Sequence, residues 1–307
     1  MKKVITISLI ICIIVIATLI IFLNRQEKEE EVAENFYISD GGIYEKTDEI
    51  NVNGINANIE KINTIKENYL KSMNTYFTLI PDKTYYLENQ IDTKFREIEN
   101  YTKEKLNSNI EYFEISNDLE LEDYYKTDMH WKQENLEEVI KTVQYELNIE
   151  NEESMYEEKT LGSFYGTYYT KIKNNVEPDE LKYLTNNSIE NSVVYNEETK
   201  TNDKVYNTEK AEETGNKYDA FLSGASALEI VKNEKANTDK KLIIFRDSFG
   251  SSLAPLLIEN YKEIVLIDLR YINHTVLEEY IDFSEYENQD VLFIYSNRVI
   301  NKSGIFR

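Results

Sequence analysis

Two short segments contain side chains whose types and spacing suit nucleophilic catalysis. The first is Asp128-Met129-His130-Trp131, which holds one of the two histidines of the chain. An Asp two residues before a His can reach the Nδ1–H group in an extended or turned backbone, where it fixes the tautomer and stabilises the imidazolium. The alternative is a capping Asp near a surface His, and the sequence leaves both interpretations open.

The second segment is RDSFG at 246–250, in which Ser248 follows a predicted buried strand and precedes a predicted helix. The serine hydroxyl would then lie at the C-terminal edge of a sheet, where free N–H groups of the helix could stabilise an oxyanion. A Ser at this position can equally be an N-cap, as can Asp247. Because a nucleophile needs a base and the base needs an orienting group, the two segments together carry more weight than either alone.

The elements around Ser248 alternate between strand and helix patterns. Short apolar runs predict strands at 241–246, 263–268 and 290–295, and helical patterns lie between them at 253–261 and 275–281. This alternation predicts an α/β fold with a parallel sheet covered on both faces. In such sheets ligands bind beyond the C-terminal ends of the strands, which is where Ser248 would lie.

The upstream half also contains helix and strand patterns, and the composition of the chain changes at residue 150. Helices are predicted at 55–72, 92–107 and 134–147, and a buried strand runs from Tyr76 to Ile80 before Pro81. Residues 150–215 are rich in Asn, Glu, Thr and Tyr, and we expect an insertion of loops and short strands there. Hairpins are expected around FYGTYYTKI and SVVYNEE, and the composition of 196–216 is compatible with disorder.

The N-terminus predicts a membrane anchor. Residues 4–23 carry no charge and are long enough to cross a hydrocarbon core of roughly 30 Å as a helix. Lys2 and Lys3 precede this run and a glutamate-rich stalk at 24–35 follows it, so the positive-inside rule places the remainder, 36–307, outside the cell membrane. The alternative is a cleaved signal peptide, but the run is longer than the usual apolar core of such a peptide.

The composition argues against several classes of binding partner. The net charge is −23, from 57 acidic and 34 basic residues, and such a surface repels nucleic acid and anionic lipid. Cys12 is the sole cysteine of the sequence, so neither an internal disulfide nor a cysteine metal cluster can form. The proposed chemistry needs no metal or organic cofactor.

The motifs resemble those of a known family. YYKTDMHW at 124–131, RDSFGSSLAPLL at 246–257 and EIVLIDLRY at 263–271 look like the DHHW proteins of Gram-positive bacteria. These are similar in turn to the alginate O-acetylation proteins of the SGNH-hydrolase-like superfamily. TLIPDK at 78–83, LGSFYGTYYTK at 161–171 and YDAFLSG at 218–224 match further segments, so the resemblance spans roughly 36–300. It implies an SGNH-hydrolase-like, flavodoxin-like α/β fold.

The resemblance also implies site residues. Asp128, His130 and Ser248 correspond to the triad of that family, whereas Met129 stands where the family name expects its first His. That position is not a triad member in the acetyltransferase relatives, so the triad is still expected to function. Weaker candidates for oxyanion or substrate contacts are Gly224, Asn297, Arg246 and Trp131, the last of which packs in the core or offers a sugar-stacking face.

Two functions follow as expectations from the resemblance. In the first, the protein is an extracytoplasmic serine O-acetyltransferase or esterase that modifies a cell-surface polysaccharide through an acyl-enzyme. The sequence leaves open whether it is the transferase or the esterase. In the second, the protein is a non-catalytic scaffold or glycan-binding subunit of a polysaccharide-modification complex. A membrane-bound acyl-donor protein is an expected partner in both.

Overall fold

The computed structural model describes Ile16 and residues 34–39, 41–46, 49–87, 94–149, 155–172 and 175–307. The predicted anchor, 1–23, and nearly all of the predicted stalk, 24–35, lie outside these ranges, and both stay predictions. Among the residues described, we find no helix with the length and apolar character that a membrane crossing requires.

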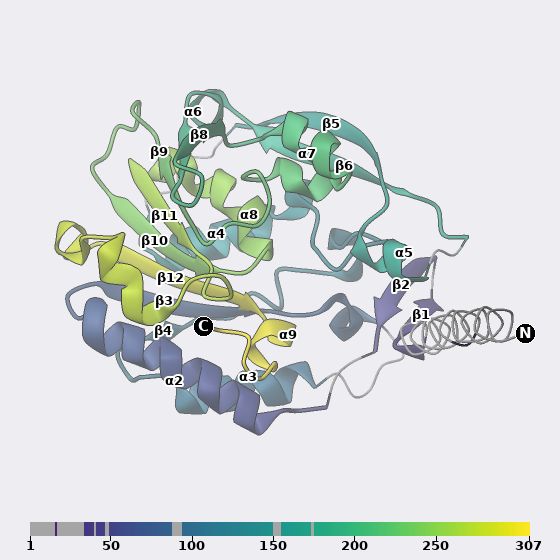
Figure 1. Ribbon diagram of the computed structural model, residues 1–307, viewed down its shortest axis with the longest axis horizontal. Coiled ribbons are helices and arrows are strands. Elements are labelled where there is room, and N and C mark those ends of the chain that lie inside the picture. Colours follow the sequence, from purple (N-terminus) through teal and green to yellow (C-terminus); the bar gives the residue numbers. More distant parts are fainter. Residues whose placement is uncertain are drawn as a thin grey trace, which may run out of the picture.

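A mixed sheet forms the centre of the fold, and within the described ranges it has eight strands. Their spatial order is β4, β3, β12, β10, β11, β9, β7, β8 (Figure 1). In that order the bounds are Glu111–Tyr112, Asn74–Ile80, Asp290–Ser296, Lys241–Arg246, Glu263–Ile267, Leu228–Lys232, Val193–Asn196 and Thr201–Lys204. The first five strands are parallel, and each of the last three pairs antiparallel with the strand before it.

Both faces of the sheet are buried because side chains alternate between the faces and the central strands are apolar at nearly every position. In β10, Leu242 and Ile244 belong to one core, whereas Ile243 and Phe245 belong to the other. Helices α4 and α8 pack in the first core, and α2 and α3 in the second, where they lie along one side of the sheet in Figure 1. The bounds of these helices are Glu137–Glu146, Phe249–Leu253, Val52–Tyr69 and Phe95–Lys105.

The α/β class is confirmed, but the prediction of a parallel sheet is wrong at one edge. Strand β9 runs against β11 because the connection from β9 to β10, residues 233–240, is shorter than the dozen or so residues that a parallel crossover needs. The helices predicted at 253–261 and 275–281 are 3-10 segments, Ala254–Asn260 and His274–Glu279. Pro255 lacks an N–H group, so the α-helical pattern of α8 ends before it.

The hairpins predicted between residues 150 and 215 are present only in part. Strands β5 and β6 pair with each other, and β7 pairs with β8, which gives the hairpin predicted around SVVYNEE. The hairpin predicted around FYGTYYTKI is absent, because these residues contain the end of β5 and the short helix α5. Residues 196–216, whose composition was compatible with disorder, contain β8 and α7. The bounds are Phe36–Ser39 for β1, Gly42–Glu45 for β2, Glu157–Phe164 for β5, Asp179–Thr185 for β6, Thr167–Ile172 for α5, Asn187–Glu190 for α6, Thr208–Thr214 for α7 and Asn297–Ile300 for α9.

The C-terminal edge of the parallel strands gathers polar residues. Strands β3, β12, β10 and β11 are neighbours, so the segments that follow them begin side by side. These segments are 81–84, 297–298, 247–248 and 268–270, and each carries charged or hydroxyl side chains.

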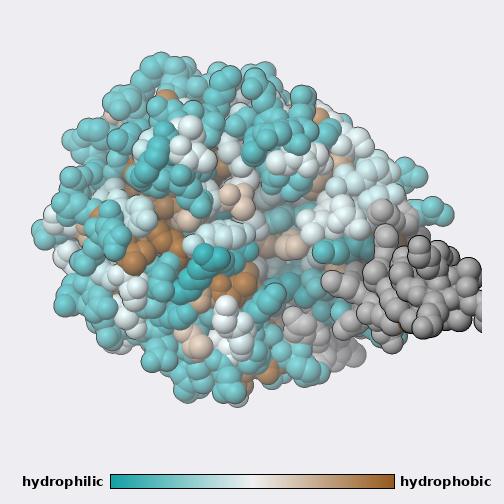
Figure 2. Space-filling view, viewed as in Figure 1, coloured by the Kyte–Doolittle hydropathy of each residue, from teal (hydrophilic) through white to brown (hydrophobic). Residues whose placement is uncertain are grey.

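The face of the molecule seen in Figure 2 is mostly hydrophilic, with small separate hydrophobic areas, as the acidic composition leads one to expect.

Candidate active site

Asp128, His130 and Ser248 form a continuous chain of hydrogen bonds. The Nε2 atom of His130 lies 2.7 Å from Ser248 Oγ, and its Nδ1 atom lies 2.5 Å from Asp128 Oδ1. Asp128 is 1% exposed and His130 is 6% exposed, so both are shielded from bulk water. Two segments separated by 118 residues therefore meet in the geometry that a serine nucleophile, its base and an orienting carboxylate require.

Asp247 leaves the hydroxyl of Ser248 free for this contact. Ser248 stands at the N-cap position of α8, but its side chain makes no capping hydrogen bond. Instead Asp247 Oδ1 accepts the N–H of Phe249 at 3.0 Å, and its Oδ2 accepts the N–H of Ser296 at 2.8 Å. Asp247 thus takes the capping role and ties the end of β10 to the end of β12.

The carboxylate of Asp128 is held from two sides. Its Oδ1 atom accepts the backbone N–H of His130 at 3.0 Å, and its Oδ2 atom accepts that of Thr167 at 2.5 Å. Gly166 lies so close that an added Cβ would be 2.2 Å from Asp128 Cβ, a distance that no side chain allows. The start of α5 therefore fixes the carboxylate, and this approach requires glycine at position 166.

These contacts also set the charge of Asp128. Burial acts to raise the pKa of this carboxyl, but the neighbouring charge of His130 and the hydrogen bonds from His130 and Thr167 outweigh it. The pKa of Asp128 is consequently held well below its usual range. An ionised carboxylate at this position can orient the imidazole and stabilise its protonated form.

Aromatic side chains hold the imidazole of His130 in place. The Tyr218 ring stacks on it at a centroid distance of 3.9 Å, and the Tyr218 hydroxyl donates to the backbone oxygen of Ser248 at 3.2 Å. Trp131 is fully buried and donates from Nε1 to Ser252 Oγ at 2.8 Å. The core-packing interpretation of Trp131 therefore holds, and a sugar-stacking face on its indole does not.

The weaker oxyanion candidates lie in other environments. The N–H of Gly224 donates to Phe221 O at 3.1 Å, so it is not a free donor. Arg246 is buried and its guanidinium lies 3.0 Å from the carboxylate of Glu229. Asn297 is buried at the start of α9, and its Oδ1 atom has no hydrogen-bond partner in the described structure. The roles of these three residues in oxyanion or substrate binding stay predictions.

A small pocket of about 70 Å³ opens beside the serine. It lies at the ends of β3, β10 and β12, and ligands of α/β sheets bind at this end of the strands. Its wall consists of Asp82, Met129, Asp247, Ser248, Phe249, Arg270, Ser296, Arg298 and Val299. The nucleophile candidate, which is partly exposed, thus lies in the wall of a pocket.

Comparison with known proteins identifies the family. The family model described as "DHHW protein" matches residues 48–267. The chain belongs to the DHHW family. No curated protein sequence matches it significantly.

Solved structures share the fold of this DHHW chain. A DHHW family protein from Eubacterium siraeum has 20% identity and a TM-score of 0.69, over 88% of this chain and 95% of that one. Bacillus cereus PatB1 has 19% identity and a TM-score of 0.68, over 89% and 98%. The O-acetyltransferase domain of Pseudomonas putida AlgJ has 10% identity and a TM-score of 0.52, over 88% and 93%. At these identities the likeness shows the fold.

The DHHW chain also contains a buried lysine beneath the Asp128 segment, which the sequence analysis did not single out. Lys83 is 1% exposed, and its Nζ atom donates to the backbone oxygens of Tyr125, Lys126 and Asp128 at 2.9, 3.2 and 2.8 Å. A signal was present in TLIPDK, where charged residues follow a buried strand directly. Charged groups at that edge of a parallel sheet lie where ligands bind in α/β folds.

Asp82, the neighbour of Lys83, links the loop after β3 to helix α9. Its Oδ1 atom accepts from the N–H and the hydroxyl of Thr84 at 2.9 and 2.7 Å, while its Oδ2 atom accepts from Arg298 Nε. Arg298 also donates to the backbone oxygen of Glu45 at 2.9 Å. One wall of the small pocket is therefore cross-linked by ion pairs and hydrogen bonds.

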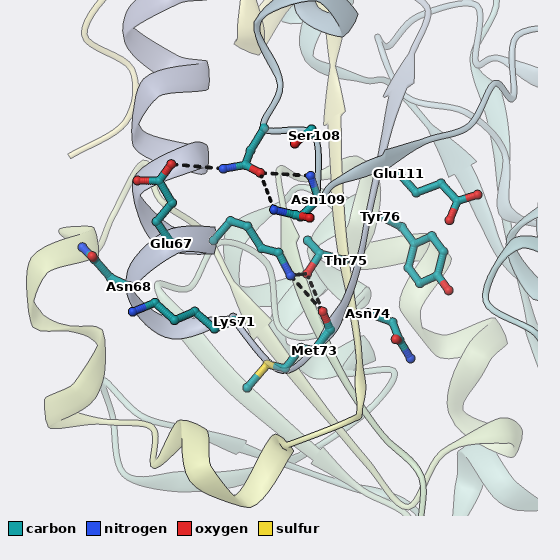
Figure 3. Close-up of a pocket in the computed structure, with 12 residues that line it drawn as sticks. Glu67, Asn68, Lys71, Met73, Asn74, Thr75, Tyr76, Ser108, Asn109 and Glu111 are labelled. Atoms are coloured by element: carbon teal, nitrogen blue, oxygen red, sulfur yellow. Dashed lines mark hydrogen bonds between the residues drawn. The ribbon is translucent and has the colours of Figure 1, made fainter.

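A much larger groove, of about 990 Å³, lies away from these residues (Figure 3). It is formed by the end of α2, the start of β3 and the loop before β4, as the sticks for Glu67, Thr75 and Asn109 show. Lys66, at its floor, donates to Leu70 O, Met73 O and Thr75 Oγ1 at 2.8, 2.9 and 2.9 Å. No predicted site residue lines this groove.

Proposed function

We propose that this DHHW chain is a serine O-acyltransferase or esterase that acts on a cell-surface polysaccharide. The observation that carries the proposal is the hydrogen-bonded chain Asp128–His130–Ser248, which ends at a pocket. Two relatives of the same fold support it. One is named an O-acetyltransferase domain, and PatB1 has been captured with a sulfonyl adduct. The polysaccharide class comes from the family resemblance.

In the first half-reaction, Ser248 takes an acyl group from an ester donor. His130 Nε2 accepts the proton of Ser248 Oγ as the oxygen forms a bond to the acyl carbon, and the carbonyl oxygen becomes an oxyanion. The backbone N–H of Ser248 is a donor for this oxyanion. The bond to the donor alcohol then breaks, the proton on His130 passes to the leaving oxygen, and a serine ester remains.

In the second half-reaction, an acceptor hydroxyl releases the acyl group. His130 takes the acceptor proton as its oxygen attacks the ester carbon, and the proton then returns to Ser248 Oγ when the serine–acyl bond breaks. A sugar hydroxyl gives transfer, and water gives hydrolysis. Asp128 keeps the imidazole oriented and stabilises its positive charge in both halves.

The proposal includes a location and a partner. An uncharged helix at 4–23 would anchor the chain in the cell membrane, with the domain on the outer side beside its polysaccharide. A membrane-bound acyl-donor protein would deliver the acyl group to Ser248. Protease digestion of intact cells that express the protein checks this placement, since an outer domain is degraded and an inner one is protected.

The test of the reaction uses the full-length protein in detergent with p-nitrophenyl acetate as donor and an oligosaccharide as acceptor. We expect nitrophenol release and an acetylated sugar detected by mass spectrometry, and we expect Ser248→Ala to lose both while its circular dichroism spectrum is retained. Retained turnover in Ser248→Ala would remove the mechanism. A folded wild-type protein that binds the oligosaccharide but releases no nitrophenol would support the scaffold function instead.

A further inference from the structure

The pocket beside Ser248 presents mainly hydrocarbon to its interior, although charged residues line it. Arg270 is paired with Asp268, with its Nη2 atom 2.6 Å from Oδ2, and Arg298 is paired with Asp82. Both oxygens of Asp247 accept backbone N–H groups. Because each of these charged side chains already has a partner in the protein, none of them requires a charged ligand.

Hydrocarbon surface in the pocket comes from Met129, Phe249 and Val299. Phe249 is fixed, because its ring packs edge-on against Trp131 at a centroid distance of 5.3 Å. Met129 and Val299 are partly buried and stand on opposite segments, one between Asp128 and His130 and the other in α9. A group that enters beside Ser248 would therefore meet apolar side chains from two walls.

The volume of the pocket limits what can enter. A cavity of about 150 Å³ in another protein holds benzene, with its six carbon atoms. On the same scale a pocket of about 70 Å³ holds roughly three heavy atoms. An acetyl group has that size, whereas a butyryl group exceeds it by two methylene groups.

We propose that this pocket receives the acyl group itself, that it selects short acyl chains, and that Met129 sets the longest chain accepted. The inference rests on the proposed function, because it assumes that Ser248 carries the acyl group. Met129 stands at the position where the family name places a histidine. An unbranched, apolar side chain there closes the pocket with hydrocarbon, and its truncation would lengthen the cavity.

Chain-length selectivity tests the inference. With the full-length protein, kcat/KM is measured for the p-nitrophenyl esters of acetate, propionate, butyrate and hexanoate. We expect the wild type to prefer acetate over butyrate by roughly 10- to 100-fold, the scale for extra methylene groups that a pocket cannot hold. Met129→Ala is expected to reduce that preference about tenfold. The preference is a ratio on one sample, so partial unfolding of a variant cancels.

Met73→Ala is the matched control, because it truncates a buried methionine at the large groove instead. It should keep the wild-type ratio. A wild type that turns over acetate and butyrate equally, or a Met129→Ala variant with the wild-type ratio, would overturn the pocket assignment while leaving acyl transfer intact. No turnover of any ester, together with no labelling of Ser248, would overturn the proposed function and the inference together.

A second measurement does not depend on turnover. Alkyl sulfonyl fluorides react when Ser248 Oγ bonds to sulfur, fluoride leaves and the proton passes to His130. We expect methanesulfonyl fluoride to label Ser248 faster than butanesulfonyl fluoride, and Met129→Ala to reduce the difference. Equal labelling rates in the wild type would contradict the size limit.

Discussion

Two cavities lie at opposite ends of strand β3, and each has a buried lysine beside it. The large groove lies where β3 begins, and the small pocket lies where β3, β10 and β12 end. Lys66 binds acceptors four, seven and nine residues away in the chain, so it stabilises a local turn. Lys83 binds backbone oxygens 42 to 45 residues away, including that of Asp128.

If the proposed function is correct, the contrast teaches that cavity size does not locate the chemistry in this fold. The groove is more than ten times larger, but the hydrogen bonds drawn in Figure 3, such as Asn107–Glu67 and Asn109–Asn107, join residues of the groove wall to one another. At the small pocket, segments far apart in sequence converge on three side chains with complementary roles. Convergence of distant segments on a nucleophile is the better sign of an active site.

The largest expected effect comes from removal of the nucleophile. Ser248→Ala should lower acyl transfer on the order of 10⁶-fold, as removal of a triad serine does elsewhere. Its melting temperature should stay near that of the wild type, because the hydroxyl caps no helix. Thr75→Ala in the large groove is the matched removal of a hydroxyl and should keep the turnover of the folded protein. A strong loss of turnover in Thr75→Ala would break the comparison.

Asp128→Asn should lower kcat by about 10⁴-fold, since an amide cannot hold the correct imidazole tautomer or stabilise its charge. The low pKa of Asp128 adds a pH dependence. A carboxyl whose pKa is depressed on folding contributes stability that is present above the unfolded pKa and is lost as the pH falls through the folded one. Urea unfolding from pH 7 to pH 3 should therefore show a smaller acid loss in Asp128→Asn than in the wild type. Equal acid sensitivity of the two proteins would speak against the low pKa.

Gly166→Ala should lower kcat by roughly 100-fold, the scale for a misplacement of about 1 Å at a catalytic group. The added Cβ must push the Asp128 side chain away, because only 2.2 Å separates them. Gly215, at the end of α7, has a positive φ but open space around it, so Gly215→Ala strains the backbone without touching the site. Steady-state kinetics and thermal melts on both variants separate displacement of the carboxylate from general strain. Similar kcat losses in both would count against the positioning role of position 166.

The smallest effect concerns the two lysines. Burial lowers the pKa of Lys83 to about 8, so this side chain loses its charge at mildly alkaline pH. Turnover should then fall severalfold above pH 8 as the Asp128 segment loosens. The unfolded chain keeps that proton up to a pKa of about 10.4, so deprotonation in this window raises the free energy of unfolding, and the loss of rate is not denaturation.

Lys83→Met should remove this alkaline loss and lower kcat more than it changes KM. Lys66→Met is the matched control, because it also deletes a buried amine with hydrogen bonds to three acceptors. It should destabilise the protein and leave the pH profile unchanged. Identical pH profiles for the wild type and Lys83→Met would show that Lys83 serves stability alone.

The central strands were accessible from the sequence, and the meeting of the two motifs was accessible from the family resemblance. The runs at 241–246 and 290–295 are apolar and have the length of buried strands, and the residues after parallel strands share an edge. The features that the sequence did not predict depend on tertiary contacts. The antiparallel edge follows from one short connection, and the importance of Gly166 and Lys83 is set by partners about 40 residues away.

The roles of the oxyanion candidates stay predictions, because their contacts also depend on tertiary structure. The N–H of Gly224 is bonded to Phe221 O and the Nη2 atom of Arg246 to Glu229, contacts that no local pattern reveals. The membrane anchor and the limits of the insertion at 150–215 stay predictions.

The most direct measurement is covalent labelling of the full-length protein with a sulfonyl fluoride or phosphonate, with the site located by mass spectrometry. If Ser248 is activated by His130, a single adduct forms at Ser248, and His130→Ala or prior denaturation abolishes it. A folded protein that leaves Ser248 unmodified under conditions that label a known serine esterase would contradict the account.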